Sequence, residues 1–165
     1  MKLLTQALVF IYVKLNRRKV FDPNGIDVGK AWPVIERVWG WAAGVYRTRV
    51  GASARRPVEL ALLQELVKAG RSSEKLFASH LLHEKPYVAA YCLLGLAELK
   101  SPVAASPPRE LLLRPESIRV HVGCFAKEQS LGDFAGKLQQ AALEEQRSEI
   151  EQKHAGGLPD RERPV

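Results

Sequence analysis

The sequence predicts a mainly α-helical fold, arranged as a single domain over residues 1–155 with a disordered tail over residues 156–165. Its 165 residues, 46% hydrophobic and 26% charged, suit one domain that can bury a core of its own. Apolar residues return every three or four positions through most of the chain, as in amphipathic helices, and Pro and Gly separate these segments. The composition excludes collagen-like, disulfide-rich and fully disordered chains.

The first expected helix covers residues 3–18, where four aliphatic residues share one helical stripe: Leu4, Leu8, Ile11 and Leu15. A strand is the alternative, because residues 8–13 are rich in β-branched and aromatic side chains. A second helix is expected over residues 33–47, opened by Pro33. Trp32 and Trp39, seven positions apart, would share its buried face, whereas Trp41 points elsewhere and is expected to be exposed.

Three more helices are expected between residues 57 and 99. Pro57 opens one that ends before Gly70, and Ser72 or Ser73 caps a short one over residues 74–83. Pro86 opens the last, over residues 86–99, which is apolar nearly all round. That pattern predicts the central and most buried helix of the domain.

The sequence pattern changes after residue 100. Four prolines within residues 102–115 exclude one continuous helix, so residues 101–117 are interpreted as a linker or an extended wrap. Apolar residues alternate with Arg119 and His121 over residues 118–122, which predicts a short strand. The spacing of Ser130 and Asp133 is that of a capping box, and it predicts a final helix that ends near Lys153.

Residues 73–99 resemble a HEAT repeat, a pair of antiparallel helices that stacks on its neighbours. The family's tight turn matches residues 83–86, and its small and apolar positions match Val88, Cys92, Leu96, Ala97 and Leu99. The sequence departs from the family at Ala89, where Arg is usual, and at Glu84, where Asp is usual. Residues 33–70 have the length of a preceding repeat. The resemblance implies stacked antiparallel helical hairpins and an interaction surface.

No motif predicts a cofactor, a metal site or catalysis. His80 and His83 could join the two cysteines in a zinc site, but Cys92 and Cys124 lack the close pairing of such sites. We expect Cys92 to fill a small buried position and the two histidines to lie at a helix end as cations. Cys124 with His121 could form a nucleophile pair, but a small buried residue at a strand end is the favoured interpretation.

The charge is unevenly distributed along the chain. The net charge is +7, and residues 1–56 contain 11 Lys and Arg against 3 Asp and Glu. Basic residues interleaved with aromatic ones are typical of surfaces that bind phosphates and stack on bases. The candidate binding residues are Arg17, Arg18, Lys19, Trp41, Arg47, Arg49, Arg55 and Arg56.

These features favour a non-catalytic helical interaction protein that binds another macromolecule, for example an acidic protein. The alternative is a sequence-tolerant nucleic-acid-binding protein that uses its basic N-terminal third. Two cysteines in the chain favour the reducing cytoplasm. The apolar run over residues 3–13 is about half the length of a membrane span, and basic residues rather than a cleavage site follow it. The sequence leaves homo-oligomerisation open.

Overall fold

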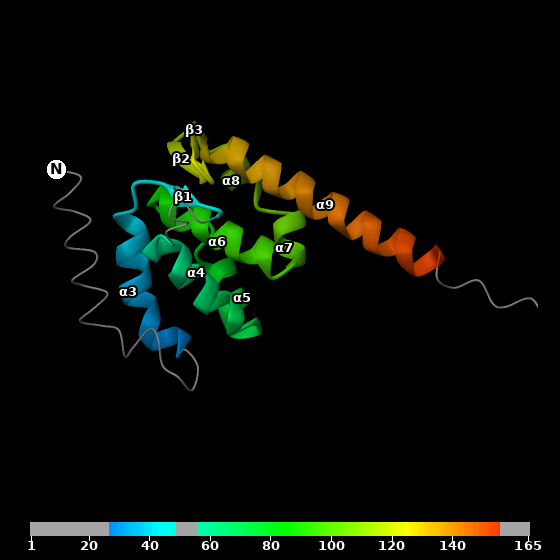
Figure 1. Ribbon diagram of the computed structural model, residues 1–165, viewed down its shortest axis with the longest axis horizontal. Helices are drawn as coiled ribbons and strands as arrows, with labels where there is room; N and C mark the ends of the chain where they lie inside the picture. The colour runs from blue at the N-terminus through cyan, green and yellow to red at the C-terminus, as the bar shows by residue number, and fades with distance from the viewer. Residues whose placement is uncertain (1–26, 49–55, 156–165) are drawn as a thin grey trace, which may run out of the picture.

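The computed structural model describes residues 27–48 and 56–155 (Figure 1). It is mainly helical, as predicted, and it also contains a small sheet, of which only one strand was predicted. The helices are α3 (Val28–Gly40), α4 (Val58–Lys68), α5 (Arg71–Ser79), α6 (Pro86–Glu98), α7 (Pro102–Ala105), α8 (Arg109–Leu112) and α9 (Leu131–Ala155). The strands are β1 (Val45–Tyr46), β2 (Ser117–Val122) and β3 (Phe125–Ser130). The expectations for residues 3–18 and for the tail over 156–165 lie outside the described residues.

Helix α6 is the centre of the core, and its prediction is confirmed. Pro86 occupies its first turn, and every residue from Val88 to Leu96 is buried. Helices α3, α4, α5, α7 and α9 and the sheet all pack around it. Gly95 lies so close to Phe77 of α5 that an added Cβ would stand 2.4 Å from the ring. The glycine therefore sets how closely α5 approaches α6.

Aromatic side chains join α3 and α6. Trp39 is fully buried, stacks on Tyr91 at 4.9 Å between ring centroids, and donates its indole N–H to the Glu59 carbonyl at 3.2 Å. Trp32 is also buried and meets Trp39 edge to face at 6.0 Å. The expectation that both indoles belong to the core is confirmed.

Helix α3 begins and ends earlier than the predicted 33–47. Asp27 caps it, since its carboxylate accepts a hydrogen bond from the Lys30 amide at 3.2 Å, and Pro33 lies inside the helix rather than at its first position. Val45 and Tyr46 form strand β1, because they pair with β2 and because the Tyr46 amide donates to the Tyr91 hydroxyl at 3.1 Å. The tertiary partners of this segment override its helical spacing.

The segment from 57 to 79 follows the prediction only in part. Pro57 precedes α4 as expected, but α5 begins at Arg71 instead of residue 74, after Gly70 at a positive φ of 63°. Ser73 does not cap the helix; it is buried, and its hydroxyl has no hydrogen-bond partner. Glycine replaces a capping side chain here because it tolerates the backbone bend.

The proline-rich segment is more ordered than a linker. Residues 101–117 contain the one-turn helices α7 and α8, with Pro102 in the first turn of α7 and Pro108 at the N-cap of α8. The Ser101 hydroxyl accepts a hydrogen bond from the Val103 amide at 3.3 Å. The prolines prevent one long helix, as expected, but Pro102 and Pro108 each lie at the start of a short one.

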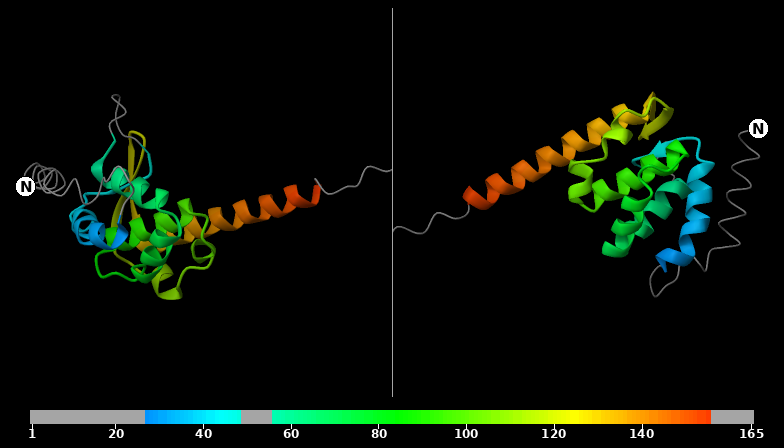
Figure 2. Two further views of the ribbon diagram at one scale, coloured as in Figure 1. Left: turned by 90° about the horizontal axis from the view of Figure 1, so that it is seen from below. Right: turned by 180° about the vertical axis from the view of Figure 1, so that it is seen from behind.

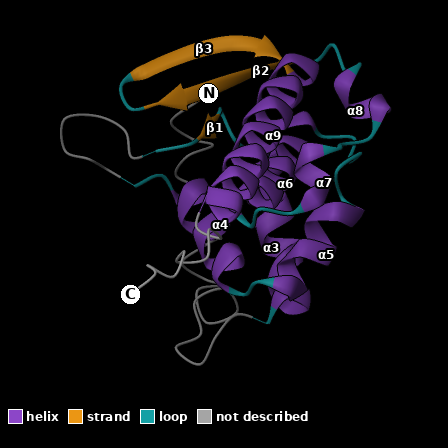
Figure 3. Ribbon diagram, turned by 90° about the vertical axis from the view of Figure 1, so that its right-hand side faces the viewer, coloured by secondary structure: helices purple, strands orange, loops and turns teal. Residues whose placement is uncertain are grey.

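The sheet has the order β1-β2-β3 and lies beside the helices (Figure 3). Strand β2 confirms the predicted strand, and it pairs in parallel with β1 and antiparallel with β3. The turn between β2 and β3 contains Gly123 at a φ of 59°. The sequence did not predict β3, because most of its residues are exposed and it lacks an alternating apolar pattern.

Helix α9 begins as predicted, since the Ser130 hydroxyl accepts from the Asp133 amide at 2.9 Å. Its first half is anchored to the core by Leu131, Phe134, Ala135 and Leu138. Beyond Ala142 the side chains that the structure describes are exposed, and the helix projects away from the body (Figure 2). Among the described helices, none combines the length and the apolar character that crossing a bilayer requires.

Candidate functional site

A half-open groove of about 400 Å³ lies between α6 and α9. Its apolar lining comes from Leu94 and Ala97 of α6 and from Leu138, Ala141 and Ala142 of α9. Its polar lining consists of Arg47, Glu98, Lys100, Ser101, Glu145, Gln146 and Glu149. The volume falls in the lower range of sites that hold ligands or side chains of a partner.

Small side chains and the end of α6 create this groove. Ala97, Ala141 and Ala142 fill little of the space between the two helices. After α6, the Lys100 amide donates to the Ala97 carbonyl at 3.0 Å and the Ser101 amide donates to the Leu96 carbonyl at 2.9 Å. This is a Schellman ending, in which Gly usually takes the left-handed position.

Lys100 takes that left-handed position, at a φ of 53°, and its side chain crosses to α9. Its ammonium group lies 2.7 Å from a Glu145 carboxylate oxygen and 2.8 Å from one of Glu149. Hydrogen bonds that the Lys100 ammonium group donates to both carboxylates raise the pKa of Lys100 above its ordinary value. The amine is therefore a cation at any physiological pH, and it neutralises part of the acidic wall of α9.

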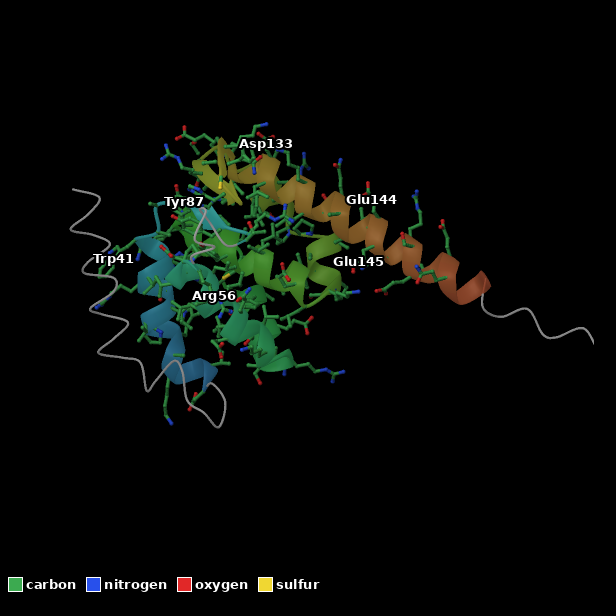
Figure 4. The ribbon with its side chains drawn as sticks, in the orientation of Figure 1. Trp41, Arg56, Tyr87, Asp133, Glu144 and Glu145 are labelled. Atoms are coloured by element: carbon green, nitrogen blue, oxygen red, sulfur yellow. The ribbon has the colours of Figure 1, made fainter. Side chains whose placement is uncertain are left out.

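Three of the predicted binding residues are described, and they lie on different elements. Trp41 lies at the end of α3 and is 44% exposed, as expected, with the Arg37 guanidinium 5.9 Å from the centre of its ring. Arg56 lies before α4, well separated from Trp41 (Figure 4). Arg47 follows β1 and lines the groove. The other predicted residues, Arg17, Arg18, Lys19, Arg49 and Arg55, lie outside the described residues.

The two histidines of α5 and its following turn make contacts within the fold. His80 stacks on Trp32 at 4.4 Å. His83 lies with Nε2 3.3 Å from a Glu36 carboxylate oxygen, while its Nδ1 accepts from the Lys85 amide at 3.0 Å. His80 is the C-cap of α5, at a helix end as expected, but burial, and secondarily His83, lower its pKa and so disfavour the cationic form expected there. In the part of the chain that the structure describes, no three metal-ligating side chains gather in one place.

The two cysteines have opposite environments. Cys92 is fully buried in α6, as expected, and burial raises the pKa of its thiol. Cys124 is exposed at the turn between β2 and β3, so the expectation that it is buried was wrong. The turn also exposes Phe125, whose side chain is 83% accessible, and the Gly123 amide donates to the Thr48 hydroxyl at 2.7 Å. The tip of the hairpin is therefore anchored to the segment that follows β1.

Comparisons with known proteins do not assign this chain to a family. No family model matches the sequence, and no match was found among curated proteins or solved structures. The resemblance of residues 73–99 to a HEAT repeat stays a prediction.

Sequence reasoning missed most of the groove. Local spacing places Glu149 four residues before Lys153, the separation of a helical ion pair, and it gives no sign that Glu149 binds Lys100 of another element. Lys100 and Glu149 are 49 residues apart in the sequence, and no local pattern connects them. The available signal was the concentration of small residues, Ala97 in α6 and Ala141–Ala142 in α9, which permits a hollow between helices.

Proposed function

We propose that this protein is a non-catalytic interaction module whose α6–α9 groove binds a segment of a partner protein. The groove is the observation that carries the proposal, because it joins an apolar floor to a charged rim. That combination is typical of grooves that accept an amphipathic helix. The projecting half of α9 extends one wall beyond the body and offers further contact area.

The polar groups that line the groove favour binding over catalysis. Glu145 and Glu149 bind Lys100, and the Ser101 hydroxyl caps α7. A nucleophilic hydroxyl needs an adjacent base, and the hydrogen bond described for Ser101 runs to a backbone amide instead. We therefore assign these groups to recognition and to local structure.

Filling the groove tests this function. Ala141→Trp would place a large side chain in the groove from an exposed position, and Ala78→Trp is the matched control on the exposed side of α5. Tagged full-length protein would be used for affinity capture from its source cells. We expect a protein that binds the wild type and the Ala78→Trp variant but not the Ala141→Trp variant. Equal capture by all three proteins, or no capture by the wild type, would contradict the proposal.

We keep nucleic-acid binding as a second candidate function, because the basic residues gather in particular segments. Residues 1–26, 49–55 and 156–165 contain 9 Lys and Arg against 3 Asp and Glu. The second of these segments begins next to Thr48, which is bonded to the hairpin tip where Phe125 is exposed. An exposed aromatic ring can stack on an unpaired base. Weaker binding of labelled single strands after Phe125→Ala would support this candidate, and an unchanged affinity would count against it.

A further inference from the structure

Lys100 holds a place in the groove that a partner's cation could take. Its ammonium group is shared by Glu145 and Glu149, and all three side chains remain about half exposed, between 48% and 59%. Water screens ion pairs at such exposure, so each pair contributes little to stability. Another ammonium or guanidinium group could therefore replace Lys100 on these carboxylates at little cost.

The acidic walls of the groove favour a basic occupant. Residues 144–151 of α9 contain four Glu and one Arg, and Glu98 adds a carboxylate to the lining from α6. Arg47 and Lys100 are the cations of the lining, and Lys100 is already bound to Glu145 and Glu149. A phosphate backbone would meet these carboxylates with repulsion, whereas Lys and Arg side chains would be attracted.

The floor of the groove favours a helix over an extended segment. Leu94 and Leu138 are buried beneath it, and Ala97 and Ala142 leave room for side chains of an approaching element. Two helices form the walls, and a strand would need an open sheet edge that these walls do not offer. A third helix can instead pack its apolar stripe between α6 and α9.

We propose that the groove binds a basic amphipathic helix of a partner protein and that Lys100 occupies Glu145 and Glu149 until a cation of this helix displaces it. The inference rests on the function proposed above and adds the chemistry of the partner. Lys100 then acts as an internal competitor, because its removal takes away an ammonium group that both carboxylates bind.

A synthetic peptide provides the probe. It has about 18 residues, with Leu and Ala on one helical face and Lys on the other, and carries a fluorophore. A second peptide has Glu in place of every Lys. Binding to the full-length protein would be measured by fluorescence anisotropy at low and at physiological salt.

Five proteins separate the roles of the charges. We expect the Lys peptide to bind the wild type. It should bind the Lys100→Met and Lys100→Gly variants about two- to five-fold more tightly, which is the change in affinity that one exposed ion pair can produce. Lys100→Gly also relieves the left-handed backbone, so agreement between the two variants shows that charge is the cause. The double variant Glu145→Gln, Glu149→Gln should bind the Lys peptide more weakly than the wild type does, with a similar fold-change in affinity for each carboxylate removed.

The matched control lies on the same helix. This double variant, Glu144→Gln with Glu151→Gln, removes the same amount of charge from residues outside the groove lining. Figure 4 shows Glu144 and Glu145 on opposite sides of α9. This control should bind like the wild type. Equal weakening by both double variants, unchanged or weaker binding by both Lys100 variants, or equal binding of the Glu peptide would overturn the proposal. If Ala141→Trp still abolishes partner capture, the groove function stands while the basic partner is rejected.

Discussion

Single glycines in this fold differ sharply in what surrounds them. The position of an added Cβ at Gly95 lies 2.4 Å from the buried Phe77 ring, whereas no atom stands within 4 Å of one added at Gly136. Both glycines lie inside helices, where Ala is otherwise the better residue. The same substitution should therefore have opposite effects at the two positions.

We expect Gly95→Ala to lower the free energy of unfolding by about 1–3 kcal/mol, because it overpacks the α5–α6 contact. Gly136→Ala should raise it by about 0.5–1 kcal/mol, because it removes a flexible residue from a helix at a position where an added Cβ meets no other atom. Urea denaturation followed by circular dichroism measures both values. A neutral or stabilising Gly95→Ala would show that Phe77 does not pack as described.

The Tyr91 hydroxyl connects the buried helix α6 to strand β1. It accepts from the Tyr46 amide at 3.1 Å and donates to the Gly44 carbonyl at 3.1 Å. Tyr91→Phe would leave both backbone groups without this partner, at a cost of about 1–3 kcal/mol in unfolding free energy. Hydrogen exchange should also show faster exchange at the Tyr46 amide. Unchanged stability and exchange would contradict this role.

Glu59 gives the protein a pH dependence of known sign. Burial raises the pKa of its carboxyl above the ordinary 4.5, so the folded protein binds this proton more tightly than the unfolded chain. The stability that the neutral form contributes is lost as pH rises from 4.5 through the folded pKa. Glu59→Gln should therefore be more stable than the wild type at pH 7, with a smaller difference at pH 4. Thermal denaturation at both pH values tests this, and an equal shift at both would contradict it.

At the scale of elements, α6 is the helix on which the others depend. Leu96 is completely buried in it, whereas Leu113, which follows α8, is 68% exposed. Leu96→Asp should unfold the domain, since an unpaired buried carboxylate costs several kcal/mol and the fold is held by roughly 5–15 kcal/mol. Leu113→Asp should leave the helical circular dichroism spectrum unchanged. A folded Leu96→Asp protein would remove α6 from the centre of the core.

The elements also show which features local sequence can predict. Helix α6 was predictable from its apolar run after Pro86, and α9 from the spacing of Ser130 and Asp133, because these signals lie within the helices themselves. Strand β1 was not, because its two residues become a strand only through β2 and Tyr91. The groove was hidden for the same reason, since its ion pairs join residues 45 and 49 positions apart.

At the scale of the whole molecule, the positive charge is concentrated outside the described residues. The described residues contain 16 Lys and Arg against 15 Asp and Glu, so nearly all of the net charge of +7 lies in the other segments. If nucleic acid binds and Arg47, Arg49, Arg55 and Arg56 each contact one phosphate, the log-log slope of affinity against salt should be about −3 to −4. Changing all four to Ser should flatten the slope without unfolding the protein. Absence of binding to single- and double-stranded DNA and RNA at about 50 mM salt would remove this candidate.

The central claim is that the groove between α6 and α9 is where the protein meets its partner. The most direct test places a photoreactive amino acid at Ala141, which lines the groove, or at Glu144, which lies outside its lining. Each full-length variant would be expressed in the source cells and irradiated, and the adducts analysed by mass spectrometry. The account predicts a strong adduct with one partner protein from position 141 and little or none from position 144. Equal adducts from both positions, or an adduct from position 144 alone, would contradict it.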